Sequence, residues 1–366
     1  MAKSARSKDG VTIYDVAKHA GVGSMTVSRV INGGHRVSPE MMVRVQASIK
    51  ALNYTPNLAA RSTRSGQTPI RIGVLYSNPS AAYLNEVMLG GLEESTRQGS
   101  QFVLEKCAGL ASQRAAVKRL LQSGVDAILL PPPLCDNKAM VDLIATEGVI
   151  PLAFATAKPN PAVSSVRIDD FAGALAMTQH LIALGHTDIG FIKGDPQHTP
   201  TELRLEGFLA AMSTAGLKVR PDRLVEGMFT YRSGLAAAQR LLRHEDRPTA
   251  IFASNDDMAA AAMAVAHGLH LEVPRDLSIC GFDDTPVATI IWPELTTVHQ
   301  PVVAMGSAAV AILCDLVRAQ RTGLKPQPMQ KLMPFELVER DSTAAPPATQ
   351  LARKAAASPE SPSRSG

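Results

Sequence analysis

Apolar residues recur at helical spacing in three short segments near the start of the chain. Thr12 can cap the first segment and Gly21 can end it, because glycine adopts the positive φ of a helix C-cap. Ser24 or Gly23 opens the second segment. In the third, Ser38 is the candidate N-cap and Pro39 the first helical residue. The apolar faces comprise Ile13, Val16, Ala17 and Ala20, then Val27, Val30 and Ile31, then Val43, Val45, Ile49 and Leu52. Three short helices with a glycine turn between the first two predict an all-α helix-turn-helix head over residues 12–56.

Beyond Pro69 the pattern changes to short apolar runs that alternate with helical segments. The runs, typical of buried parallel strands, are residues 72–76, 102–105, 127–130, 151–154, 189–192, 250–253 and 278–281. The helical segments are residues 84–98, 113–122, 140–147, 172–184, 203–215, 234–242, 258–267 and 301–316. The alternation predicts a two-lobed, doubly wound parallel α/β domain over residues 70–341.

The remaining segments are short or of biased composition. Residues 57–69 contain a helix-capable stretch too short to be stable alone, which predicts a conditional hinge helix and linker. Residues 1–11 are basic and are expected to be flexible. Residues 342–366 are rich in Ala, Pro and Ser, a composition that predicts a disordered tail.

Charge is concentrated at the N-terminal end. Residues 1–66 hold ten Lys or Arg and three Asp or Glu, a difference of +7 in a chain whose total is +4. A basic head on a mildly acidic body is typical of a nucleic-acid-binding domain attached to a separate module. The second helix of a helix-turn-helix lies in the major groove of DNA, and here it carries Ser24, Met25, Thr26, Ser28 and Arg29. Arg29 can contact guanine or phosphate, Met25 a thymine methyl, and the hydroxyls phosphates.

Polar residues directly after the predicted strands are candidates for a ligand site, because ligands of open α/β sheets bind at the carboxyl ends of strands. These candidates are residues 78–83, Thr156, Asp169, Asp170, Asn255, Asp256, Asp283 and Asp284. With Arg204 and the rings of Tyr83 and Phe229, they suit a polyhydroxylated ligand. The alternative for Asn255 is a plain helix cap.

The motifs resemble one family. Residues 12–33 (TIYDVAKHAGVGSMTVSRVING), VSPE at 37–40, LNYTPN at 52–57 and ARS at 60–62 resemble the headpiece of the lactose-repressor (LacI/GalR) family. In the body the resemblance lies in LIALGHTDIGFIKG at 181–194, RLEGF at 204–208, FASNDDMA at 252–259, SICGFDDT at 278–285 and PELTTVHQP at 293–301. It implies a periplasmic-binding-protein-like (type I) effector domain.

The resemblance also implies roles for individual residues. The implied DNA-contacting residues are Tyr14, Ser24, Met25, Thr26, Ser28, Arg29, Asn32, Ser38, Asn57, Leu58, Ala60, Arg61 and Thr63. The implied effector-contacting residues are Arg204, Phe229, Asn255, Asp283 and Gln300. Tyr83, Thr156 and Asp170 are added as effector candidates from their positions after the predicted strands. Thr156 stands where some relatives carry an acid. Thr63 stands where the family inserts a leucine into the minor groove, and a β-branched, half-polar side chain predicts a smaller DNA kink.

We therefore expect a transcriptional regulator, with repression as the family's commonest mode, that binds a palindromic double-stranded DNA operator as a homodimer. A small-molecule effector, a sugar or sugar derivative, would shift its conformational equilibrium. No apolar heptad repeat follows Arg340, which predicts no tetramer formed through the tail. The sequence does not tell which sugar binds, or whether it induces or co-represses.

Two other classes remain as alternatives. One is a sugar-processing enzyme using Asp256, Asp257, Asp283 and Asp284, although H-E-x-x-H, G-x-x-x-x-G-K-[ST], G-x-G-x-x-G and G-x-S-x-G motifs are absent from the sequence. The other is a transport-type sugar-binding protein, for which a signal peptide would be expected. The four cysteines form no C-x-x-C pair, and we expect no metal, no cofactor and no membrane span. The expected location is cytoplasmic, at the nucleoid.

Overall fold

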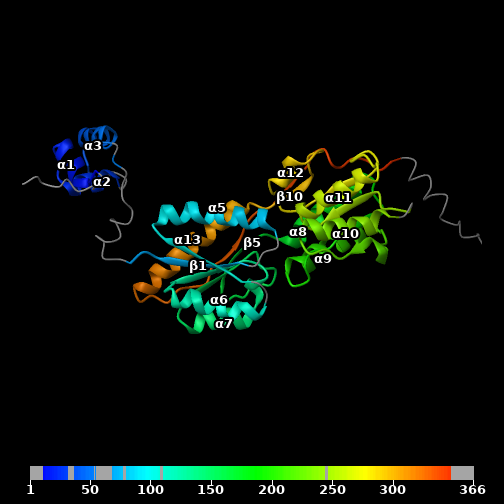
Figure 1. Cartoon of the computed structure of the whole chain (residues 1–366), viewed down its shortest axis with the longest axis horizontal. Coiled ribbons are helices and arrows are strands. Elements are labelled where there is room, and N and C mark those ends of the chain that lie inside the picture. Colours follow the sequence, from blue (N-terminus) through cyan, green and yellow to red (C-terminus); the bar gives the residue numbers. More distant parts are fainter. Residues whose placement is uncertain are drawn as a thin grey trace, which may run out of the picture. The chain divides into compact units, whose positions relative to one another are not determined.

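A computed structural model describes residues 11–31, 37–52, 54, 68–76, 80–107, 110–243 and 246–347. The chain divides into two compact units, residues 1–68 and 69–366, and each is treated separately (Figure 1). The smaller unit is here called the head and the larger the effector unit.

The head contains three helices, α1 (Ile13–Ala20), α2 (Ser24–Ile31) and α3 (Pro39–Ala51). Thr12 and Asp15 form a capping box at the start of α1, and Gly21, with φ 64°, ends it. Ser38 Oγ accepts a hydrogen bond from the backbone N–H of Met41 at the start of α3. The three predicted helices are confirmed. They pack around a small core of Val16, Ala17, Ala20, Val27 and Val45.

The first lobe of the effector unit, the N-lobe, is built on a six-stranded parallel sheet in the order β11-β5-β4-β3-β1-β2. Its strands are β1 (Arg71–Tyr76), β2 (Gln101–Lys106), β3 (Ala127–Leu130), β4 (Ile150–Phe154), β5 (Ser164–Arg167) and β11 (Gln330–Leu332). One face is covered by α5 (Ala81–Gln98) and α13 (Val302–Arg321), and the other by α6 (Leu110–Gln122) and α7 (Lys138–Thr146), as Figure 1 shows. A 3-10 turn, η1 (Leu134–Asp136), follows β3.

The second lobe, the C-lobe, has a four-stranded parallel sheet in the order β7-β6-β8-β9. Its strands are β6 (Ile189–Ile192), β7 (Leu224–Val225), β8 (Ala250–Ala253) and β9 (Ser278–Cys280). Its helices are α8 (Asp170–Ala183), α9 (Pro200–Thr214), α10 (Tyr231–Leu242), α11 (Asp256–Gly268) and α12 (Val287–Ile290), with a 3-10 turn η2 (Pro221–Arg223). The pair α8 and α9 pack together, as do α10 and α11. The predicted α/β class with two doubly wound halves is confirmed.

The chain passes between the lobes three times. It leaves the N-lobe after β5 to enter α8, and returns through β10 (Thr297–His299) to α13. It leaves the N-lobe again after β11, and β12 (Glu336–Val338) then pairs antiparallel with β10. Three crossings therefore link the lobes, and the strands β10 and β12 of two of them pair with each other.

Helix α13 is the one described helix that is long and apolar enough to span a membrane by length and composition. In the effector unit 61% of its most apolar 18-residue stretch is buried, against α5 and strands of the N-lobe sheet. Packing inside the lobe therefore accounts for its apolar composition.

The structure differs from the sequence-based expectations at short elements and at one boundary. Strands β5, β7, β10, β11 and β12 have two to four residues each and were not predicted. The tail was expected to begin at residue 342, but residues 342–344 are packed against the C-lobe. Ser342 is fully buried and its Oγ donates to the carbonyl of Ile279 (2.6 Å). His186 Nε2 contacts the Ala344 carbonyl (2.9 Å). Residues 342–344 thus complete the C-lobe, because their polar groups replace water at its buried edge.

Candidate functional site

A cavity of about 380 Å³, counted with its open mouth, lies between the two lobes. It is lined by Ser80, Tyr83, Pro132, Ala155, His198, Pro200, Arg204, Phe229, Asn255 and Asp283. Most of these residues follow the carboxyl end of a strand, where parallel sheets present ligand-binding loops.

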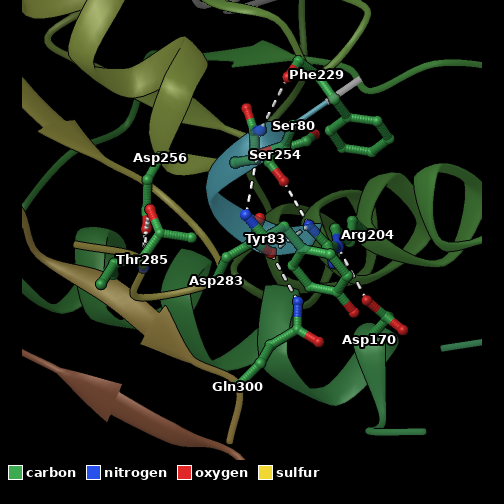
Figure 2. A network of polar contacts seen from close by, with 12 residues as sticks. Ser80, Tyr83, Asp170, Arg204, Phe229, Ser254, Asp256, Asp283, Thr285 and Gln300 are labelled. Atoms are coloured by element: carbon green, nitrogen blue, oxygen red, sulfur yellow. Dashed lines mark hydrogen bonds and ion pairs between the residues drawn. The ribbon is translucent and has the colours of Figure 1, made fainter. Parts of the chain in front are cut away.

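Arg204 is the central charged group of this cavity (Figure 2). Its Nε donates to Asp170 Oδ1 (2.9 Å), and its Nη1 donates to the Ser254 carbonyl (2.5 Å) and to Asp283 Oδ1 (3.3 Å). The guanidinium carbon lies 3.7 Å from the centroid of the Phe282 ring. Burial disfavours the charged form, but the two carboxylates outweigh it and raise the pKa of Arg204 above its ordinary value. One face and two edges of the guanidinium are therefore fixed before any ligand binds.

Asp283 is held in a strained backbone conformation, with φ 110°. Gln300 Nε2 donates to its Oδ1 (2.6 Å), so this oxygen is shared between the amide and Arg204. Burial raises the pKa of Asp283 to about 7, although Arg204 and Gln300 act in the opposite direction. The carboxyl is therefore poised between its protonated and ionised forms near neutral pH.

Asn255 and Phe229 are positioned by each other. Asn255 Oδ1 caps α11 by accepting from the N–H of Met258 (3.1 Å), and its Nδ2 donates to the carbonyl of Phe229 (3.1 Å). Phe229 has φ 55°, an uncommon conformation for a bulky residue, and its ring occupies the space above Gly194. The cap interpretation of Asn255 is therefore correct, and the same residue also lines the cavity.

Tyr83 and His198 bring neutral polar groups into the cavity. Each is less than 7% exposed, and neither side chain makes a hydrogen bond to a residue within the described ranges. Burial raises the pKa of the Tyr83 hydroxyl well above its ordinary value and lowers the pKa of His198 to about 4. Both remain uncharged at neutral pH and can hydrogen-bond a ligand as donor or acceptor.

The head presents a separate candidate surface on α2. Met25 is 70% exposed and Arg29 is exposed one helical turn later, whereas Val27 is fully buried against α1 and α3. Ser24, Thr26 and Ser28 are half-buried on its flanks, and Tyr14 is 60% exposed on α1. This arrangement directs one apolar side chain and one guanidinium away from the head's core, as base readout requires.

Family models match both parts of the chain. Residues 12–57 match the model described as bacterial regulatory proteins, lacI family, and residues 178–343 match the periplasmic binding protein-like domain. The HTH-type transcriptional repressor PurR of Haemophilus influenzae (strain PittEE) is 34% identical over 334 residues, which cover 90% of this chain and 98% of the relative. The ribose operon repressor of Escherichia coli (strain K12) is 35% identical over 336 residues, covering 90% and 99%.

The chain belongs to the LacI family. It is a DNA-binding transcriptional regulator whose effector unit binds a small molecule. Solved structures agree: the transcriptional regulator CelR in complex with cellobiose has a TM-score of 0.69 at 30% identity, covering 91% of this chain and 99% of the other. The Lac repressor dimer bound to operator and the anti-inducer ONPF has a TM-score of 0.67 at 28% identity, covering 92% and 100%.

Most of the predicted effector residues line the cavity between the lobes or contact its lining. Tyr83, Arg204, Phe229, Asn255 and Asp283 line it. Asp170 and Gln300 lie behind the lining and contact Arg204 and Asp283. Thr156 is not brought to the lining: its hydroxyl donates to Asp136 and accepts from the N–H of Lys158 (3.1 Å).

Four lining residues were missed by sequence reasoning: Pro132, Ala155, His198 and Pro200. All follow the carboxyl ends of β3, β4 or β6, so the rule that identified the other candidates also applies to them. Three of them offer the cavity apolar surface, for which the sequence carries no chemical signal. Among the predicted DNA contacts, Asn32, Asn57, Leu58, Ala60, Arg61 and Thr63 lie outside the described residues.

The raised pKa of Asp283 predicts a specific pH dependence of stability. An ordinary aspartate in the unfolded chain ionises near pH 4, whereas folded Asp283 ionises at about 7. Between these values the unfolded state binds fewer protons, so this residue's contribution to stability falls as pH rises and is constant above pH 7. We expect Asp283→Asn to gain stability relative to the natural protein from pH 4.5 to 7. The measurement is the thermal unfolding temperature of both proteins as a function of pH. Equal slopes of this temperature against pH for the variant and the natural protein would contradict the prediction.

Proposed function

We propose that this LacI-family regulator is a sugar-responsive repressor that binds a palindromic operator as a homodimer. The observation that carries the sugar assignment is the charge balance of the cavity. Arg204 is the one cation among the described residues of its lining, and it already forms ion pairs with Asp170 and Asp283. A phosphorylated or carboxylated effector would need a further cation, whereas an uncharged polyol needs hydroxyl-binding groups and an aromatic wall.

The lining residues supply those groups. Asp283, Asn255, Tyr83, His198 and the guanidinium of Arg204 offer donors and acceptors, and the Phe229 ring offers a face for the C–H side of a sugar. The relatives support the assignment, since one is named a ribose operon repressor and one solved structure is a cellobiose complex. We infer that the protein acts by binding and not by turnover, in the cytoplasm on nucleoid DNA.

The function is tested by selecting a preferred double-stranded site from random DNA. Affinity for that site is then measured with and without each member of a panel of neutral sugars and their phosphate esters. Release or tightening by one neutral sugar is the expected result, and its sign identifies inducer or co-repressor. Absence of any preferred site at physiological salt would overturn the DNA-binding assignment. A response to phosphate esters alone would overturn the neutral-sugar assignment, and a chemically altered sugar would favour the enzyme.

Arg29 gives a direct test of the head. We expect Arg29→Ala to weaken binding to the selected site by about 5- to 150-fold, the worth of one good base contact of 1–3 kcal/mol. Binding to random DNA should weaken much less. Lys50→Ala, which removes an exposed cation near the end of α3, is the matched control and should cause at most a small loss equal for all sequences. Equal losses on both DNAs for Arg29→Ala would assign Arg29 to the backbone instead.

A further inference from the structure

Two hydrogen bonds from hydroxyls to carboxylates cross the cleft between the lobes. Ser80 Oγ in the N-lobe donates to Asp257 Oδ2 in the C-lobe (2.8 Å). Thr199 Oγ1 in the C-lobe donates to Asp136 Oδ2 in the N-lobe (2.5 Å). We call them the Ser80–Asp257 clasp and the Thr199–Asp136 clasp. Each lobe supplies the hydroxyl of one clasp and the acid of the other.

Each clasp joins a pair of facing cavity walls. Ser80 itself lines the cavity and caps the helix that carries Tyr83, and Asp257 follows the lining residue Asn255 by two positions. Figure 2 shows Ser80 on the same side of the network as Phe229, whose carbonyl is bound by Asn255. The separation between the Tyr83 wall and the Asn255 wall is therefore fixed by the first clasp.

The second clasp joins the opposite walls. Thr199 lies between the lining residues His198 and Pro200, and its hydroxyl also accepts from the N–H of Ala157 (3.0 Å). Asp136, on η1, additionally accepts from Thr156, which follows the lining residue Ala155. One carboxylate thus connects β4's loop to the start of α9, and this explains the placement of Thr156 outside the cavity.

We propose that Asp136 and Asp257 are positioning residues of the effector site, which set the closed separation of the two lobes through these clasps. The proposal rests on the cavity being the effector site of the proposed function. Ser80 and Thr199 are 4% exposed and half-buried, so the clasps are shielded from water, and hydrogen bonds to charged groups are the stronger kind. An ion pair between described residues, Lys158–Glu202, also crosses the cleft, but its side chains are 64% and 59% exposed and it contributes little.

The clasps have a consequence for effector affinity. A ligand that binds the closed cleft has an apparent affinity reduced by the fraction of molecules that are open. Clasps formed before ligand binding keep that fraction small, since two charge-assisted hydrogen bonds must break together for the lobes to part. Asp136 and Asp257 therefore act on affinity without any contact to the effector.

Thr199→Val is the sharpest test, because Thr199 stands at the N-cap of α9 but makes no capping hydrogen bond. Valine keeps the shape and removes the hydroxyl. Backbone hydrogen exchange of the ligand-free full chain is measured by mass spectrometry. We expect exchange in the facing N-lobe segment around Asp136, residues 134–140, to become about tenfold faster. Ala157 is left out of this readout, because valine also removes the acceptor of its N–H. Thr199→Ser keeps the hydroxyl and should restore the natural rate.

Asp257→Ala tests the other clasp in the same way. It should accelerate exchange at residues 80–84, in the lobe that does not carry the substitution. The matched control for Thr199→Val is Thr178→Val, a buried threonine whose hydroxyl donates to the Ala174 carbonyl within α8 and does not cross the cleft. It should leave both facing segments unchanged.

Acceleration confined to α9 or α11, the elements that carry the substitutions, would overturn the proposal, as would equal acceleration by Thr178→Val. The measurement needs no effector, so its failure would refute the clasps and leave the sugar assignment intact. Conversely, a panel without any responding sugar would refute the assignment and leave the exchange result intact.

Discussion

Arg204→Met is expected to destabilise the effector unit by about 3 to 5 kcal/mol, the usual effect of removing one partner from a buried ion pair. Asp170 and Asp283 are each at most 5% exposed, and both lose their cation in this variant. Methionine fills much of the volume, so the loss reports the two buried acids, which must stay unpaired or take up a proton once the cation is gone, and not a cavity. Urea denaturation of the full chain followed by circular dichroism measures the free energy of unfolding.

Two further variants separate charge from shape. Adding Asp170→Asn and Asp283→Asn to Arg204→Met removes the unpaired charges, and part of the lost stability should return. Arg223→Met, at another buried arginine that is paired with Asp188 (2.7 Å) away from the cavity, should also destabilise the C-lobe but leave the sugar response in place. An Arg204→Met variant as stable as the natural protein would refute the interpretation of Arg204 as the centre of the site.

Gly90→Ala is expected to cost 1–3 kcal/mol or more through overpacking, although alanine is the better helix former. Gly90 lies where α5 crosses α13, and a Cβ built on it would overlap the carbonyl oxygen of Val303. Gly306 on α13 is also close, since its Cβ would lie 2.5 Å from the Val87 carbonyl oxygen. The two helices must therefore move apart to admit a methyl group, and the thermal unfolding temperature should fall.

Gly268→Ala is the matched control for that substitution. Gly268 is also helical, at the end of α11, has no positive φ, and a Cβ there would meet nothing within 4 Å. Alanine should be neutral or stabilise by up to about 1 kcal/mol, because it reduces the freedom of the unfolded chain. If the two alanines shifted the unfolding temperature alike, the close crossing of α5 and α13 would not be a determinant of stability.

The fold was readable from the sequence wherever an element was long or strongly patterned. Thr12, Gly21, Ser38 and Pro39 marked helix ends because their local chemistry alone satisfies the terminal backbone groups. Strand β11 has three exposed residues, so it lacks the apolar pattern of a buried strand. It pairs with β5, whose residues lie some 165 positions earlier in the sequence, and no local sequence pattern predicts such a pairing. The burial of Ser342 was missed for the same reason: the partners are Ile279 and Thr296.

The site was only partly readable. Asp283 and Asn255 could be identified because they follow buried strands, where parallel sheets place their ligand-binding residues, although Asn255 also serves as a helix cap. The shift of Thr156 out of the lining could not, because it depends on Asp136, an acid on a different loop that reaches the same point in space. His198 carried no signal in sequence beyond its position after β6, and its neutrality comes from burial that only the folded lobes create.

Because the chain passes between the lobes three times, neither lobe can finish folding until late in synthesis. The N-lobe needs α13 and β11, which are made after the whole C-lobe sheet, and the C-lobe needs β12 and Ser342, which are made later still. A ribosome that has synthesised the first 300 residues therefore carries two incomplete cores, each with an open apolar surface. Such nascent chains expose the surfaces that chaperones bind, so residues 302–342 determine whether the earlier ones become protected.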